Sequence, residues 1–355
     1  MNRNIKSCCS RWRPRRLAAL ALAGAVLLGA AGCAQRGEEA QTLRLGVALY
    51  AQDDTFIASL TQDLERLVQE AEVERGQRIN LSVMDAANNQ TTQMGQVDRL
   101  LERGCDVLFV NIVDRTAASV IVDKAQEAGA PLIFFNRQPV AEDINYRGRV
   151  YYVGASAEES GRLQGELVAE AWNSESGLDR NGDGVIQYVM LEGEPGHQDS
   201  LLRTEYSIKA VTEAGIEVEK LANAPANWNR GQGAARMSQW LKEYGEDIEV
   251  VFSNNDDMAL GAIDAIREWG GPMPLVVGVD ATAPAREAVA EGDLYGTVLN
   301  DAQGQARAMV ELALALADGG KPDQVVELQE DHYVWLPYRQ VNRENLEDIV
   351  QEMER

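Results

Sequence analysis

The sequence predicts an α/β protein built from two doubly wound domains, each with a parallel sheet. Short apolar strands alternate with amphipathic helices along the chain, which is typical of a parallel sheet covered by helices on both faces. The repeated units are too numerous for one compact sheet. The length of 355 residues, with 45% hydrophobic and 25% charged residues, suits two hydrophobic cores.

The first series of elements begins after residue 41. The helix expected at 56–68 shows the pattern best, because its apolar residues fall at positions 56, 57, 60, 64, 67 and 68. The series contains expected strands at 43–49, 79–84, 107–110 and 131–135, and expected helices at 56–68, 91–101 and 117–128.

A second series continues the same alternation as far as residue 316. Its expected strands lie at 151–153, 186–191, near 218, and at 250–252, 275–279 and 294–299. Its expected helices lie at 160–172, 201–211, 233–241, 258–269, 283–289 and 302–316. The two series together predict two sheets with helical cover.

The N-terminal residues have the features of an export signal. Arginines between positions 11 and 16 precede an apolar run at 17–28, which is shorter than the roughly 20 residues that a membrane span needs. The run is followed by GAAGC at 29–33, which resembles the lipobox of bacterial lipoproteins, with Ala30 where leucine is commonest.

We therefore expect residues 1–32 to be a lipoprotein signal peptide and Cys33 to carry the lipid. Residues 33–41, small and charged, would tether the first strand to the membrane. The mature protein would lie outside the cytoplasm, in the periplasm or cell envelope. An ordinary signal peptide cut elsewhere is the alternative.

Charge and cysteine content exclude other classes. With 33 Lys and Arg against 56 Asp and Glu, the formal net charge is −23, which argues against a nucleic-acid partner because phosphate binding needs a basic face. Removal of the signal would leave two cysteines, the lipidated Cys33 and Cys105. Since only Cys105 would then have a free thiol, no internal disulfide is expected. Cys105 precedes an apolar run and is interpreted as a small buried hydrophobe.

Acidic and amide residues recur where the expected strands end. Ligands of doubly wound sheets bind outside the carboxyl ends of the strands. Sugar hydroxyls both donate and accept hydrogen bonds, so a sugar site needs carboxylates, amides and aromatic faces. Each acid or amide taken singly could instead cap the following helix. The turns concerned are 50–56, 111–114, 196–199, 254–256 and 278–280.

The chain from about residue 43 to 346 resembles the bacterial periplasmic D-galactose/D-glucose-binding proteins, the solute receptors of ABC sugar importers. The most specific stretches are YAQDDTF at 50–56, GEPGH at 193–197, NND at 254–256 followed by MA at 258–259, and GTVLND at 296–301. The resemblance implies that Phe56 and Trp228 stack on a pyranose ring. It implies polar sugar ligands at Asp54, Asn111, His197, Asp199, Arg203, Asn255, Asp280 and Asn300.

The same resemblance implies a three-segment hinge, with crossings near Pro131, Asn300 and Trp335. The N-terminal sugar-binding domain would then comprise residues 42–130 plus 300–335. The C-terminal domain would comprise residues 131–299 plus 336–355.

A second motif, DRNGDGVIQ at 179–187, has the pattern of a calcium loop. Oxygen-bearing side chains at loop positions 1, 3, 5 and 9, glycine at 6 and a carbonyl at 7 match an EF-hand, but position 12 is Met190 rather than glutamate. The resemblance implies that Glu249 completes a structural Ca²⁺ site. The expected ligands are Asp179, Asn181, Asp183, the Val185 carbonyl, Gln187 and Glu249. An Asx-rich turn without metal is the alternative.

The expected function is capture of D-galactose or D-glucose between two domains and delivery to a membrane ABC permease, with a chemoreceptor as a further partner. We expect a monomer without catalytic residues, since no serine-hydrolase, zinc-protease or phosphate-loop motif occurs. The same clamp for a pentose or signalling sugar is one alternative. A glycoside hydrolase using Asp54 and Asp280 is another. A repressor of related fold is excluded, because it would carry a helix-turn-helix in place of the signal.

Overall fold

The computed structural model describes residues 42–145, 148–174 and 177–353, which belong to one compact unit. The predicted signal peptide, Cys33 and the tether lie outside the described residues. No helix in the described ranges is long and apolar enough to cross a membrane.

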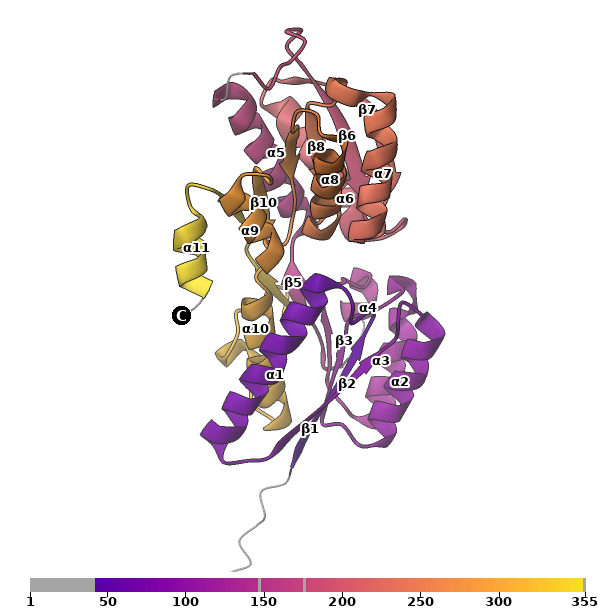
Figure 1. The fold of residues 1–355 in the computed structure, drawn as a ribbon. Helices are drawn as coiled ribbons and strands as arrows, with labels where there is room; N and C mark the ends of the chain where they lie inside the picture. The colour runs from indigo at the N-terminus through magenta and orange to yellow at the C-terminus, as the bar shows by residue number, and fades with distance from the viewer. Residues whose placement is uncertain (1–41, 146–147, 175–176, 354–355) are drawn as a thin grey trace, which may run out of the picture. The chain divides into compact units, whose positions relative to one another are not determined.

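The first lobe is built on a six-stranded sheet in which every pairing is parallel (Figure 1). In spatial order its strands are β11 (Tyr333–Leu336), β5 (Val150–Ala155), β4 (Leu132–Phe135), β3 (Val107–Val110), β1 (Leu43–Leu49) and β2 (Ile79–Asp85). One face packs against α1 (Thr55–Arg75) and α10 (Ala302–Ala317). The other packs against α2 (Gln90–Glu102) and α3 (Ala118–Ala128), and α4 (Ala141–Asn145) lies before β5.

The second lobe repeats this arrangement on a second six-stranded sheet. Its strands in spatial order are β12 (Arg339–Asn342), β10 (Gly296–Leu299), β9 (Leu275–Val277), β8 (Val250–Ser253), β6 (Val185–Glu192) and β7 (Glu217–Pro225). Only β12 is antiparallel to its neighbour. Helices α5 (Ala157–Ser174) and α6 (Gln198–Glu213) cover one face, and α7 (Arg230–Glu243), α8 (Asp256–Trp269) and α9 (Ala283–Glu291) cover the other. The last helix is α11 (Leu346–Met353).

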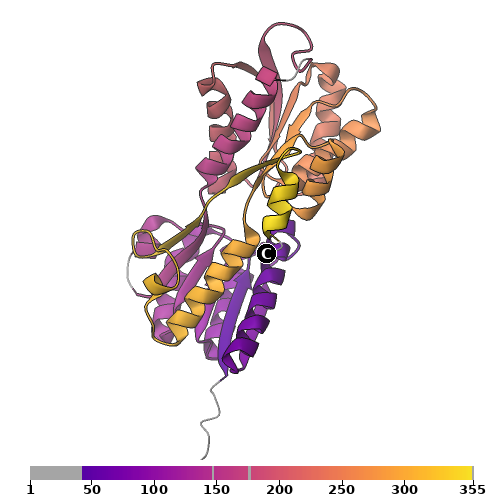
Figure 2. The same cartoon turned by 90° about the vertical axis from the view of Figure 1, so that its left-hand side faces the viewer.

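Three short segments connect the lobes (Figure 2). The chain passes from β5 to α5, from β10 to α10, and from β11 to β12. The second and third of these lie beside the predicted crossings near Asn300 and Trp335.

The predicted crossing at Pro131 is wrong. Strand β4 pairs with β3, and β5 pairs with β4, so residues 131–155 belong to the first lobe. All four residues of β4 are completely buried within the first sheet. The chain therefore leaves the first lobe between Ala155 and Ala157, and the strand expected at 151–153 belongs to the first sheet.

Some elements extend beyond their predicted limits. Helix α1 continues past its apolar stripe and ends at Gly76, whose φ of 58° terminates it in a left-handed cap. Strands β11 and β12 were not predicted, since they are short and lie on either side of a lobe crossing. Cys105 is half-buried and packs against the α2–α3 face, and burial raises its thiol pKa to about 11, which agrees with an apolar role.

Candidate functional site

A cavity between the lobes collects residues from the ends of both sheets. The atoms that surround it leave about 340 Å³ free, counting the part open to solvent. Eight of the ten predicted sugar ligands line it: Asp54, Phe56, His197, Asp199, Arg203, Trp228, Asn255 and Asp280. Tyr50, Asn136 and Arg137 complete the lining.

On the first lobe, Asp54 has two structural partners. Its carboxylate caps α1 by accepting the Ile57 N–H at 3.0 Å, and it accepts a hydrogen bond from the Tyr50 hydroxyl. The guanidinium of Arg137 lies 3.4 Å from the centroid of the Tyr50 ring. Burial and the Asp54 charge raise the Tyr50 pKa well above its usual value, so the phenol stays protonated and donates to Asp54.

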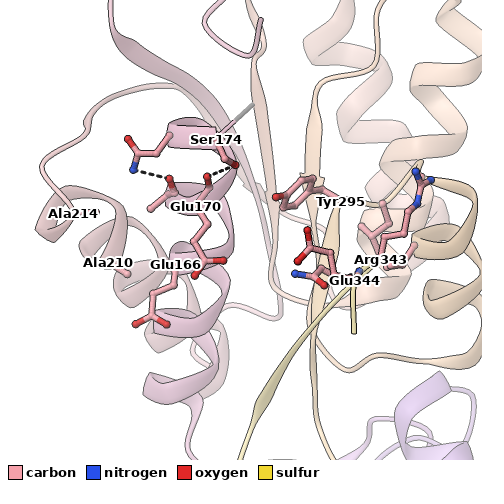
Figure 3. A pocket seen from close by; sticks show the side chains of 14 residues that line it. Glu166, Glu170, Ser174, Ala210, Ala214, Tyr295, Arg343 and Glu344 are labelled. Atoms are coloured by element: carbon pink, nitrogen blue, oxygen red, sulfur yellow. Dashed lines mark hydrogen bonds between the residues drawn. The ribbon is translucent and has the colours of Figure 1, made fainter. Parts of the chain in front are cut away.

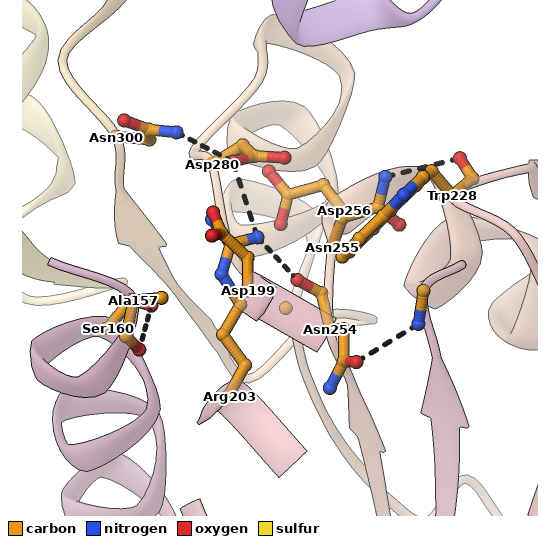
Figure 4. A network of polar contacts seen from close by, with 12 residues as sticks. Ala157, Ser160, Asp199, Arg203, Trp228, Asn254, Asn255, Asp256, Asp280 and Asn300 are labelled. Carbon is orange, nitrogen blue, oxygen red and sulfur yellow. Dashed lines mark hydrogen bonds and ion pairs between the residues drawn. The ribbon is translucent and has the colours of Figure 1, made fainter. Parts of the chain in front are cut away.

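On the second lobe, Arg203 is the buried cation of the site (Figure 4). It donates to the Asn254 carbonyl at 2.8 Å and to the Tyr338 hydroxyl at 3.1 Å. Its nitrogens lie 3.5 Å from the Asp199 carboxylate and 4.0 Å from that of Asp280. Burial raises the pKa of both carboxyls, and Arg203 opposes that rise. Asp199 and Arg203 thus form an i,i+4 ion pair while both line the cavity.

His197 is the N-cap residue of α6, and its imidazole ring is neutral. Its Nδ1 accepts the Asp199 N–H at 3.1 Å, so Nε2 carries the proton and is a donor. Burial, followed by the charges of Arg137, Arg203 and Arg115, lowers its pKa well below 6.5.

The His197 ring meets the Trp228 ring edge to face, with centroids 5.4 Å apart. Trp228 has a φ of 61°, an unusual value for a bulky residue. Its carbonyl accepts from Asn255 Nδ2 at 3.2 Å, and Asn255 Oδ1 caps α8 by accepting the Met258 N–H. A Cβ on Gly193 would lie 2.1 Å from the indole carbons, so this position needs glycine for the ring to fit.

Two predicted ligands, Asn111 and Asn300, do not line the cavity and lie buried behind it. Asn111 donates to the Phe135 carbonyl at 3.0 Å and to Asn136 Oδ1 at 3.2 Å. Asn300 donates to Asp280 Oδ1 at 3.2 Å and accepts from Gln305 at 2.7 Å. In this structure the two amides support Asn136 and Asp280, which do line the cavity.

The lining residues Tyr50, Asn136 and Arg137 were not among the predicted ligands. Asn136 and Arg137 follow β4 directly, so the strand-end rule that selected the other turns would have found them. Tyr50 follows β1 and lies inside the stretch 50–56 that carried the resemblance.

Comparison with known proteins gives the family. The family model for the periplasmic binding protein domain matches residues 45–321. The chain belongs to the periplasmic binding protein family.

Curated relatives of this family match over nearly the whole chain. The D-galactose/methyl-galactoside binding periplasmic protein of Haemophilus influenzae is 38% identical over 93% of this chain and 97% of its own length. A putative rhizopine-binding protein of Rhizobium meliloti is 31% identical over the same shares of the two chains.

A solved structure agrees. An ABC transporter solute-binding protein from Bacillus halodurans with bound myo-inositol has a TM-score of 0.73 and 30% identity, covering 89% of this chain and 99% of the other. The predicted fold class and family resemblance are therefore confirmed. As a member of this family, the chain is an extracytoplasmic solute-binding protein and not an enzyme, so the glycosidase alternative is wrong.

The predicted calcium loop at 179–187 runs into the first residues of β6 and packs against Glu249. The Glu249 carboxylate, 1% exposed as a residue, accepts the Arg180 N–H at 2.6 Å and the Gln187 N–H at 3.1 Å. Asp183 accepts from the Asn181 and Gln187 amides at 2.9 Å each.

The donor set is suited to Ca²⁺, since it consists of carboxylates, side-chain amides and a backbone carbonyl. Burial raises the pKa of Glu249, and the nearby charges of Asp179 and Asp183 raise it further. Yet in residues 42–145, 148–174 and 177–353 no three acidic, histidine or cysteine side chains converge closely enough to hold a metal. Two amide NH₂ groups point at Asp183 and would have to turn their oxygens inward.

A larger cavity, about 1840 Å³ when the part open to solvent is counted in the same way, lies in the second lobe and contains none of the predicted site residues (Figure 3). Glu166, Glu170 and Ser174 of α5 face Tyr295, Arg343 and Glu344 across it. It is lined by one lobe alone, so it does not combine strand ends from both sheets. Size therefore does not identify the solute site of this protein.

Proposed function

We propose that this protein captures D-galactose or D-glucose between its lobes and delivers the hexose to an ABC importer. The observation that carries the proposal is the lining of the cavity between the lobes. Asp54, Asp199 and Asp280 supply acceptors, Arg137 and Arg203 supply donors, and two aromatic rings stand beside them. This set suits a pyranose, whose hydroxyls need paired donors and acceptors while its C–H faces need apolar contact.

The relatives support the choice of hexose. The Haemophilus influenzae relative, at 38% identity, is named for D-galactose and methyl-galactoside. We propose the ten predicted residues as the sugar-binding set, with Asn111 and Asn300 acting through Asn136 and Asp280.

Direct contacts between the lobes support a clamp mechanism. Glu194 of the second lobe accepts from Arg137 and from Asn88 of the first lobe, each at 3.0 Å. Thr55 of the first lobe donates to Asp257 of the second at 2.6 Å. We infer that an open form admits the sugar and that these contacts form on closure, giving the permease a distinct shape to recognise.

The same clamp for another polyhydroxylated solute is the second candidate. Relatives at similar coverage are named for rhizopine and, at 29% identity, for xylitol, and the Bacillus halodurans structure holds myo-inositol. Binding of a pentose or a signalling sugar is therefore the alternative hypothesis for the solute of this chain.

Calorimetric titration of refolded, sugar-free mature protein separates the two candidates. D-glucose, D-galactose, D-ribose, D-xylose and myo-inositol should be titrated in parallel. The proposal predicts saturable heat with the two hexoses and none with the others. If only a pentose or inositol gave saturable heat, the clamp mechanism would stand, but the proposal that the solute is a hexose would be wrong.

We propose that Cys33 carries a lipid anchor and that a chemoreceptor is a further partner of the closed form. Mass spectrometry of protein extracted from membranes should find a diacylated Cys33 as the first residue. A Cys33→Ala variant should appear in the soluble fraction. An unmodified N-terminus elsewhere would show an ordinary signal peptide.

We propose that the 179–187 loop binds a structural Ca²⁺ through Asp179, Asn181, Asp183, the Val185 carbonyl, Gln187 and Glu249. The close packing of Glu249 on the loop supports this. Calcium should raise the melting temperature of chelator-treated protein, and Asp183→Asn should remove most of that increase. An equal increase in the variant would favour a metal-free turn.

A further inference from the structure

The turn that carries Asp280 has an unusual backbone. Asp280 has a φ of 117° and Ala281 has a φ of 50°, both in the region that side chains other than glycine rarely adopt. Such a conformation persists only when its surroundings hold it. Asp280 is also one of the three carboxylates that line the cavity.

Asp256, at the start of α8, is the buried group that holds this turn. Its carboxylate accepts the Thr282 N–H at 2.8 Å, the Thr282 hydroxyl at 3.3 Å and the Thr297 hydroxyl at 2.6 Å. The residue is completely buried and does not line the cavity. Figure 4 shows its carboxylate beside Asp280.

Thr297 of β10 links the same carboxylate to the middle of the turn. Its hydroxyl accepts the Ala281 N–H at 3.2 Å. A hydroxyl has a single proton, so one that points at Asp256 leaves a lone pair for Ala281. Both amides that follow Asp280 are therefore bound, directly or through Thr297, to Asp256.

The neighbouring glycine leaves room for this network. A Cβ on Gly278 would lie 2.3 Å from Asp256 Oδ1. Burial raises the pKa of the Asp256 carboxyl to about 7, while its hydrogen bonds from Thr297 and Thr282 lower it. Three donors thus compensate a carboxyl group that water cannot reach.

We propose that Asp256 is a positioning residue of the sugar site, which fixes the Asp280 carboxylate toward the ligand through Thr297 and Thr282. The identity of the sugar that Asp280 contacts rests on the proposed function. The hydrogen bonds that restrain the turn lie within the second lobe and do not depend on that function. Asp256 acts through other residues and makes no contact with the sugar.

Two substitutions at Thr297 test this proposal, because they separate the contribution of the hydroxyl from that of the methyl group. Thr297→Val keeps the shape and removes the hydroxyl, whereas Thr297→Ser keeps the hydroxyl and removes a methyl group. Thr297→Val removes both hydrogen bonds of the hydroxyl, so we expect it to weaken D-galactose and D-glucose binding roughly tenfold or more. Thr297→Ser should bind within about twofold of the wild type.

If Thr297 served packing alone, the order would reverse, because serine leaves a void and valine does not. Equal sugar affinity in wild type and Thr297→Val would also overturn the proposal. Asp256→Asn provides a second test, because Asn presents an NH₂ group where one acceptor stood. Its effect on sugar affinity should be less than additive with that of Thr297→Val if both act through one network.

Hydrogen exchange of the peptide over 280–283 gives a readout that needs no sugar. Exchange at Ala281 and Thr282 should be faster in Thr297→Val than in Thr297→Ser or wild type. If the wild type bound neither hexose, the proposed function would fail, and this exchange would still show whether the network holds the turn. Unchanged exchange in Thr297→Val would overturn the positioning role whatever the ligand.

Discussion

The two lobes share a strand order yet contribute differently to the site. In both, the first strand of the lobe lies one place from the edge and the later strands follow in sequence order toward the other edge. The second lobe supplies Asp199, Arg203 and Asp280, charges already paired with one another. The first lobe supplies Asp54 and Arg137, and Arg137 bonds to Glu194 of the opposite lobe.

This difference indicates that the two lobes contribute to the binding site in different ways. The second lobe is a preformed half-site, because its buried Asp199, Arg203 and Asp280 charges are paired with one another within the lobe. In the proposed clamp, the first lobe completes the site when the lobes close. Substitutions in the second lobe should therefore damage both stability and binding, while those in the first lobe should act mainly on binding.

The largest effect is expected from Arg203→Met. The change leaves the Asp199 and Asp280 carboxyls buried without their cation, which typically costs about 3–5 kcal/mol. Calorimetry should find hexose affinity reduced at least about 100-fold, and thermal unfolding should shift to lower temperature. Arg162→Met is the control, because Arg162 does not line the cavity, pairs with the exposed Glu158 and Glu213, and lies over the Tyr206 ring. A normal hexose affinity in Arg203→Met would refute the preformed half-site.

A smaller effect on binding alone is expected from Asp54→Asn. Asparagine still caps α1, so the free energy of unfolding should change little. Loss of a charged acceptor should weaken hexose binding about tenfold or more. Asp301→Asn is matched to it, since Asp301 caps α10 by accepting the Gly304 N–H and does not line the cavity. Equal binding by the two variants would show that Asp54 is only a cap.

The contact between lobes should give a modest kinetic effect. Glu194→Gln removes the charge that pairs with Arg137, whose side chain is 5% exposed. Stopped-flow measurements should show hexose release a few-fold faster with little change in association, since contacts made on closure act on dissociation. Glu213→Gln removes a charge of similar type at an exposed pair and should leave both rates unchanged. Faster association without faster release would contradict the clamp.

The smallest effect is a pH dependence from His197. Its folded pKa lies well below 6.5 because of burial, so the unfolded chain binds the proton more readily. Stability is therefore lost as pH falls below about 6.5, by about 1 kcal/mol between pH 7 and 5.5.

Denaturant titrations of wild type and His197→Gln over this range isolate the contribution, because the buried acids are common to both proteins. The acids have raised pKa values and so give the opposite slope, with stability rising as pH falls. Parallel pH profiles for the two proteins would mean that His197 does not titrate as its burial requires.

Much of the architecture could be predicted because the local signals agree. Apolar strands such as 107–110 and helical stripes such as that of α1 are visible without tertiary information. The strand-end rule located most of the lining residues, since it depends only on where strands stop. The resemblance added residue roles that spacing alone could not give.

The errors have physical causes. The run 131–135 is apolar whichever sheet it joins, so its pairing with β3 could not be derived from periodicity. Whether Asn111 or its neighbour Asn136 lines the cavity depends on side-chain direction, which no sequence pattern records. The role of Asp256 depends on Thr282 and Thr297, which are distant in sequence and meet only in the folded lobe.

Small-angle X-ray scattering is the decisive experiment for the proposed closure of the two lobes on a hexose. We expect saturating D-galactose or D-glucose to lower the radius of gyration of sugar-free mature protein, and we expect no such change in Arg203→Met. An unchanged radius of gyration in the wild type, at sugar concentrations that calorimetry shows to be saturating, would contradict the clamp.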